Sequence, residues 1–127
     1  EILGNPSMSK VDLHSVSENE RFDYSGLLDR VCNDRELLAE LVLLQLDQFP
    51  KQMKHLIDAI ERSAFEEIKQ IAHSIKGSAL NMGLNRIGKI AEQLESLDCE
   101  KQSNRVQLLQ DEWDHTRDIL ERYALLS

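Results

Sequence analysis

Residues 63–83 read SAFEEIKQIAHSIKGSALNMG, and this stretch sets the fold prediction. Its apolar residues recur three and four positions apart, which is the spacing of one face of an amphipathic helix. Ser63 and Glu66 have the spacing of a capping box, which favours a helix start at this point. Gly83 suits the left-handed conformation that ends many helices. We therefore predict a helix that continues to Met82 and is followed by a turn.

A long apolar segment, residues 37–60, precedes this stretch. It is apolar on more than one side, so we expect several neighbouring helices to cover it. Asn33 and Glu36 resemble a capping box at its start, with Asn in place of Ser or Thr. Pro50 removes one backbone donor and crowds the preceding turn, so it predicts a kink or a short break. A shorter helix is predicted over residues 24–31.

Two more helices are predicted downstream, from about residue 84 to 97 and from about 102 to 124, because each segment carries one apolar stripe at helical spacing. Sustained alternation with a period of two, typical of strands, does not occur. The predicted fold class is all-α: an antiparallel four-helix bundle with an additional short N-terminal helix. Residues 1–21 are polar and mixed and are predicted to form a linker or flexible arm. Residues 22–127 would form the bundle domain.

The composition limits the partners of this chain. Its 127 residues suggest one domain, and 15 Lys plus Arg against 23 Asp plus Glu give a net charge of 15 − 23 = −8. An acidic surface argues against nucleic acid and anionic membrane as partners, and no apolar run reaches the roughly 18 residues needed to cross a bilayer. Cys32 and Cys99 form no CxxC motif and are interpreted as small buried residues. We expect a cytoplasmic monomer.

His73 is predicted to point away from the core. At about 100° per residue, it lies roughly 150° from the centre of the apolar face of its helix. Residues three and four positions apart share a helix face, so Lys76 and Gly77 lie beside it. Lys69 and Gln70 lie on this face one turn earlier. The pattern therefore combines an exposed imidazole, two cations and a bare stretch of backbone.

This combination favours phosphoryl transfer to a ring nitrogen. An exposed imidazole is largely neutral near pH 7 and can attack through one nitrogen while the other holds the proton. Nearby ammonium groups stabilise the charge on the transferred group; Lys76 is the best placed and Lys69 is a second candidate. A glycine inside a helix costs about 1 kcal/mol relative to alanine, so Gly77 suggests close approach of a partner. Leu80 and Gln70 would extend that docking patch.

The turn at Gly83 predicts which residues face His73. His73 lies ten positions before the turn, so residues near 93 come level with it in an antiparallel helical hairpin. Three polar residues lie there and could accept a hydrogen bond from the ring: Glu92, Gln93 and Glu95. The pattern leaves the choice among them open.

Residues 72–83, AHSIKGSALNMG, resemble the signature of histidine-containing phosphotransfer (HPt) domains, which is His-x-x-Lys-Gly with a second glycine six positions further on. The small residues Ala72 and Ala79 and the sequence IAEQLE at 90–95 also fit. The resemblance covers about residues 24–125. It implies a four-helix bundle that accepts a phosphoryl group on His73 from the aspartate of a response-regulator receiver domain and passes it to another receiver.

The same resemblance implies further roles. Lys76 would stabilise the phosphoryl group, and Gly77 would permit close approach. In the family, a Gln or a similar polar residue on the next helix often contacts the histidine, and Glu95 falls near that place. The partners would be receiver domains and a hybrid sensor histidine kinase. The domain would need no cofactor of its own, since Mg²⁺ would come with the receiver, and it would not be an independent enzyme.

Two alternatives belong to other functional classes. One is a metal-binding carboxylate bundle, which uses a Glu-x-x-His motif on each of two helices; this chain has a single such motif, Glu112 with His115. The other is a helical interaction module whose histidine is never phosphorylated. An outward-facing Gly77 beside His73 argues against the second alternative, because a scaffold gains nothing from it.

Overall fold

The structure is a computed structural model that describes residues 17–96 and 99–126. Its described residues form helices and contain no strand, which confirms the all-α prediction. The helices are α2 (Glu18–Arg21), α3 (Tyr24–Arg30), α4 (Arg35–Glu61), α5 (Phe65–Met82), α6 (Asn85–Ser96) and α7 (Cys99–Leu126).

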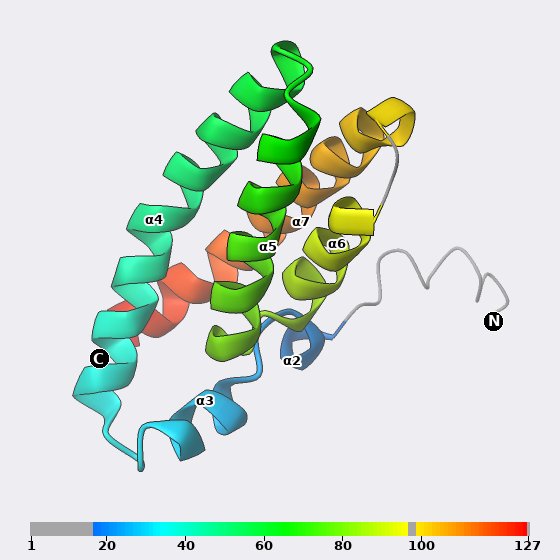
Figure 1. Ribbon diagram of the computed structural model, residues 1–127. Coiled ribbons are helices and arrows are strands. Elements are labelled where there is room, and N and C mark those ends of the chain that lie inside the picture. The colour runs from blue at the N-terminus through cyan, green and yellow to red at the C-terminus, as the bar shows by residue number, and fades with distance from the viewer. Residues whose placement is uncertain (1–16, 97–98, 127) are drawn as a thin grey trace, which may run out of the picture.

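The four long helices form the predicted bundle. Helix α4 packs against α5 and α7, and α6 packs against the same two helices, which closes the ring of four. Figure 1 shows α4, α5, α6 and α7 side by side, with the short helices α2 and α3 at one end. Helix α3 contacts α4, and α2 contacts α6.

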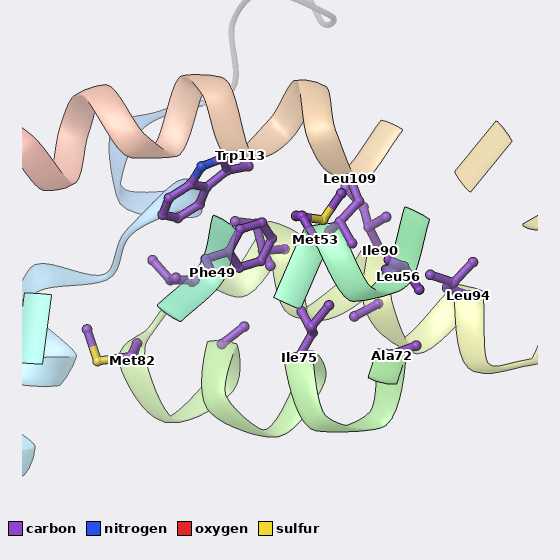
Figure 2. Close-up of a cluster of buried hydrophobic side chains, with 14 of the residues drawn as sticks. Phe49, Met53, Leu56, Ala72, Ile75, Met82, Ile90, Leu94, Leu109 and Trp113 are labelled. Carbon is purple, nitrogen blue, oxygen red and sulfur yellow. The ribbon is translucent and has the colours of Figure 1, made fainter. Parts of the chain in front are cut away.

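Apolar side chains from all four long helices fill the centre of the bundle (Figure 2). Phe49 of α4 stacks on Trp113 of α7 with 4.3 Å between ring centroids. Ile75 of α5 and Leu94 of α6 are fully buried in the same cluster. Burying one such side chain contributes roughly 1.5–3 kcal/mol, so the apolar stripes that predicted the helices also hold them together.

Helices α4 and α5 begin one residue later than the predicted caps. Asp34, not Asn33, caps α4: its carboxylate accepts a hydrogen bond from the Leu37 backbone nitrogen at 3.0 Å. Ala64 stands at the N-cap of α5 and makes no side-chain cap bond. Ser63 has a φ of 55°, because it occupies the left-handed position that ends α4. The predicted capping boxes at these two helix starts are therefore wrong.

Two further predictions need correction. The predicted short break at Pro50 does not occur, because α4 continues through this residue, with buried Phe49 and Met53 on either side to anchor it in the core; the alternative prediction, a kink, stays a prediction. Cys32 is exposed, because it lies in the turn after α3 with a φ of 55°. The prediction that it is buried is therefore wrong. The side chain of Cys99 lies outside the described residues.

The segment before α3 docks onto the turn between α5 and α6. Phe22 is 1% exposed and packs edge-on against Tyr123, with 5.2 Å between ring centroids. The Asp23 backbone nitrogen donates to the Gly83 carbonyl at 2.9 Å. Helix α2, which has a complete Ser17 capping box, falls within the predicted arm of residues 1–21; residues 1–16 of that arm lie outside the described part of the chain.

A buried carboxylate joins α2, α6 and α7. Glu112 is 4% exposed, and its two oxygens face two different guanidinium groups. Oε2 lies 2.6 Å from Arg21 Nε, and Oε1 lies 3.1 Å from Arg86 Nε. The Thr116 hydroxyl donates to Oε2 at 3.5 Å. These bonds satisfy a charge that would otherwise be costly to bury, and they connect the short N-terminal helix to the bundle.

Candidate functional site

His73 lies on the outer surface of α5, as predicted. Its side chain is 71% exposed, because other residues of the helix fill the buried face. Those residues are Ile68, Ala72, Ile75, Ala79 and Met82. The exposed ring is therefore accessible to another protein without any rearrangement of the core.

The next helix supplies the partner of the ring. Gly83 has a φ of 80° and ends α5 in a left-handed conformation, as predicted, so α6 returns antiparallel along α5. In this register Glu95 Oε2 lies 3.1 Å from His73 Nδ1. Glu92 and Gln93, the other two candidates, have exposed side chains on α6. The structure therefore selects Glu95 among the three residues that the sequence left open.

The chemistry of the two groups fixes the tautomer of the neutral ring. An ionised carboxylate can only accept hydrogen bonds, so in the neutral ring Nδ1 of His73 carries the proton and its N–H donates a hydrogen bond to Glu95. The hydrogen bonds from Lys76 and, more weakly, from His73 hold the pKa of Glu95 below its ordinary value of 4.5, although partial burial opposes the shift. Glu95 is therefore ionised near neutral pH, and the Nε2 lone pair of His73 is free.

Lys76 is the third member of this group. Its Nζ lies 2.9 Å from Glu95 Oε1, so each carboxylate oxygen serves one partner. The sequence placed Lys76 beside His73 but did not predict its pairing with Glu95. Lys69 and Gln70 are exposed one turn earlier on α5. We call His73, Lys76 and Glu95 the histidine triad.

Gly77 lies beside the triad and is exposed. A Cβ built on this residue meets nothing within 4 Å, and its φ lies outside the left-handed region. Neither packing nor backbone conformation within the chain therefore requires a glycine here. The open backbone is consistent with the predicted approach of a partner.

Leu80 extends the surface toward α6. It is 46% exposed, and its Cδ2 lies only 2.6 Å from the position of a Cβ built on Gly88. Gly88 thus allows Leu80 to lie across the backbone of α6. Gly88 was not among the site residues predicted from the sequence, although a glycine among the apolar positions of a helix signals such a close approach.

The residues of the metal-site alternative have other partners. Glu112 faces Arg21 and Arg86, as described above. His115 is exposed, and its Nδ1 lies 2.9 Å from the Asp111 carbonyl. Within residues 17–96 and 99–126, no group of three or more His, Cys, Asp and Glu side chains is arranged to hold a metal ion.

In a comparison with protein families, the model of the Hpt domain matches residues 40–124. Comparisons with curated proteins and with solved structures gave no match. Hpt domains are helical bundles that carry phosphoryl groups on a histidine in phosphorelays and interact with response-regulator receiver domains. They are phosphotransfer carriers rather than enzymes. The match covers more than half of the chain and includes all of α5 and α6, so the chain belongs to the Hpt domain family.

Proposed function

We propose that His73 accepts a phosphoryl group from the phosphorylated aspartate of one receiver domain and passes it to the aspartate of another. The observation that carries this proposal is the geometry of the histidine triad. The ring is 71% exposed, its Nδ1 is held by Glu95, and Lys76 lies on the second oxygen of the same carboxylate. A ring that is held in one orientation, with the proton on Nδ1 and a lone pair on Nε2, is activated for nucleophilic attack.

The transfer step follows from this arrangement. The Nε2 lone pair attacks the phosphorus atom, and the bond from phosphorus to the aspartyl oxygen breaks with its electron pair on the carboxylate. Charge then lies on the equatorial oxygens, where the ammonium groups of Lys76 and Lys69 would stabilise it. In the second half of the relay, the carboxylate of the next receiver attacks and Nε2 leaves. Mg²⁺ would come with the receiver, and the chain itself would supply no cofactor.

The docking surface of the receiver would centre on Gly77. The open backbone there allows the aspartyl phosphate to come close to His73. Gln70 and Leu80 flank this position on the exposed side of α5, and Leu80 offers an apolar contact. We propose that the domain acts as a monomer, with a hybrid sensor histidine kinase as the upstream partner.

The cellular setting is also part of the proposal. None of the helices in the described part of the chain combines the length and apolar character of a membrane span. The net charge of −8 disfavours anionic membrane and nucleic acid. We place the relay in the cytoplasm, where receiver domains would meet His73 by diffusion.

Transfer of radiolabelled phosphate from a phosphorylated receiver tests the proposal. The wild type should take up label that is labile in acid and stable in base, and His73→Gln should take up none. His115→Gln is the matched control, because His115 is also exposed but lies on α7. It should label like the wild type. Equal labelling of His73→Gln and the wild type would contradict the proposal, as would the absence of label from both.

A further inference from the structure

A groove lies between α4 and α7, on the side of the bundle opposite to the histidine triad. In the ring of four long helices, α4 contacts α5 and α7, and α6 contacts the same two helices. The groove therefore faces away from the pair α5 and α6, which carries His73 and Glu95. Its volume is about 390 Å³, enough to receive bulky side chains of a partner. A protein bound there would not cover the ring of His73.

Helix α4 has an apolar stripe beside this groove, in addition to the residues that it buries in the core. Leu43, Pro50 and Ile57 are spaced seven positions apart and therefore share one face of the helix. All three are exposed, Leu43 to 55% and Ile57 to 41%, and the last two line the groove together with Trp113 of α7. The stripe spans about 21 Å at 1.5 Å per residue. This length matches a helix of a partner better than a small molecule.

The charged residues that line the groove are cations. They are Lys54 of α4 and Arg117 of α7, and none of the described lining residues is acidic, although the chain has 23 acidic and 15 basic residues. Lys54 forms no ion pair with another described residue, because Asp58, four positions later, pairs with Arg62 at 2.8 Å. Arg117 lies 3.7 Å from Asp114, a weak pair between half-exposed side chains. Both cations can therefore pair with carboxylates of a partner.

We propose that this groove binds an amphipathic helix of a partner protein, which places apolar side chains in the groove and acidic side chains beside Lys54 and Arg117. An apolar helix face seated in a hydrophobic groove is a recurrent mode of recognition. Burial of apolar atoms would supply most of the affinity, and the cations would select an acidic helix over a basic one. At physiological salt the Debye length is about 8 Å, so these two cations outweigh the distant charges behind the net −8.

The consequence is that tethering and transfer would not compete. The bound helix would hold the domain next to its partner from the side of α4 and α7, while receivers reach His73 from the side of α5 and α6. The inference concerns a different surface from the proposed phosphotransfer site and does not depend on phosphorylation of His73.

The fluorescence of Trp113 provides a direct test, because it is the single tryptophan of the chain and it lines the groove. The probe is a tryptophan-free synthetic helix of about 18 residues, roughly 27 Å long, with Leu at the a and d positions of its heptads and Glu at the flanking positions. The control peptide carries Lys in place of each Glu. We expect a saturable change of Trp113 emission with the Glu peptide and about tenfold weaker binding of the Lys peptide.

Variants of the protein locate the binding surface. Ile57→Ser should weaken binding of the Glu peptide about tenfold, and Lys54→Glu should weaken it about fivefold. Leu44→Ser is the control for the first variant, since Leu44 is an exposed residue of α4 outside the stripe. Lys89→Glu is the control for the second, since it makes the same charge change at an exposed position of α6. Both controls should bind the Glu peptide like the wild type.

Several results would overturn the inference: no saturable change of Trp113 emission, equal affinity for the two peptides, or equal affinity of Ile57→Ser and the wild type. A dimeric wild type that Ile57→Ser makes monomeric would also contradict it, because a second copy would then fill the groove. His73→Gln should bind the Glu peptide like the wild type. A wild type that binds this peptide but takes up no phosphoryl label would support the inference and contradict the proposed function.

Discussion

Two carboxylates in this protein each face two nitrogen groups, and they differ in burial and in the residues they face. Glu112 is 4% exposed and contacts Arg21 and Arg86. Glu95 is 25% exposed and contacts His73 and Lys76. The distances are similar, between 2.6 and 3.1 Å. Contact geometry alone therefore does not separate a structural carboxylate from a functional one.

The partners make the difference. Arginine stays charged at all accessible pH values and offers no nucleophile, so the Glu112 cluster can only hold helices together. It joins residues that are 91 and 26 positions apart in the sequence. The imidazole of His73 can change its protonation state and react, and it is accessible to a partner. The Glu112 cluster connects helices, whereas the histidine triad leaves the ring of His73 exposed to solvent.

Removal of the Glu112 carboxylate should have the largest effect on stability. In Glu112→Ala the largely buried guanidinium of Arg21 and the partly exposed guanidinium of Arg86 lose their shared counter-charge. We expect the free energy of unfolding to fall by about 3 kcal/mol, measured by urea denaturation. Glu121→Ala, an exposed position of the same helix, is the control and should change it little. A loss below about 1 kcal/mol would show that the cluster is not a structural element.

A substitution beside the histidine triad should change the free energy of unfolding in the opposite direction. Gly77→Ala places a Cβ in open space on a helix, so we expect the free energy of unfolding to rise by about 1 kcal/mol. Gly77→Leu should keep a stable helix and slow phosphoryl transfer. Gly83→Ala is the contrasting control: with a φ of 80° and the Asp23 carbonyl 3.1 Å from the new Cβ, it should lower stability by about 1–2 kcal/mol. Unchanged transfer in Gly77→Leu would remove the case for close docking at this position.

Loss of the Glu95 charge should barely affect stability. Glu95→Gln removes a partly exposed ion pair with Lys76, and such pairs contribute at most about 1 kcal/mol. Denaturation curves of the variant and the wild type should therefore nearly coincide, while transfer slows. A loss as large as that of Glu112→Ala would show that Glu95, like Glu112, is a structural carboxylate.

The smallest expected effect is on how the free energy of unfolding depends on pH in acid. The pKa of Glu95 is lower in the folded state than its ordinary value of 4.5, chiefly because Lys76 donates to it. A depressed folded-state pKa stabilises the fold fully above the unfolded-state value, and this contribution is lost as pH falls through the folded-state value. The small difference in unfolding free energy between wild type and Glu95→Gln should therefore be constant near neutral pH and shrink below about pH 4.5. A difference that grew in acid would contradict the direction of the shift.

The sequence predicted the four long helices because apolar periodicity is a local signal. The ends of the helices were harder to predict from the sequence. Ser63 looked like the cap of α5, but it is used as the left-handed residue that ends α4, with the Ala64 nitrogen donating to the Ala59 carbonyl at 2.9 Å. Two neighbouring helices compete for the same short turn. The spacing of cap residues alone does not show which helix uses them.

The site was predictable in part. Helix periodicity placed His73 on the outer face, and the turn at Gly83 narrowed its partner to three residues. Counting ten residues on each side of Gly83 brings residue 93 level with His73, and Glu95 lies two positions beyond it. Side chains on a helix lean toward its N-terminus, so His73 leans away from the turn while Glu95 leans back toward it.

The Glu112 cluster was not predicted, because its arginine partners lie far away in the sequence. Glu112 was interpreted only as a possible metal ligand together with His115. One local signal was available. Glu112 lies between Leu109 and Thr116 at helical spacing, so a charged residue occupied the edge of the apolar stripe of α7. A charge in that place needs a partner from another helix.

The hairpin of α5 and α6 makes the triad sensitive to length. His73 and Glu95 are 22 positions apart, with the turn at Gly83 between them. One inserted or deleted residue in either arm would rotate the helix beyond it by about 100° and shift it by about 1.5 Å, which would carry Glu95 away from the ring. The number of residues between His73 and Glu95 therefore determines whether the two side chains meet. An insertion between His73 and Glu95 would therefore separate the ring from its carboxylate and would also turn buried residues such as Leu94 away from the core.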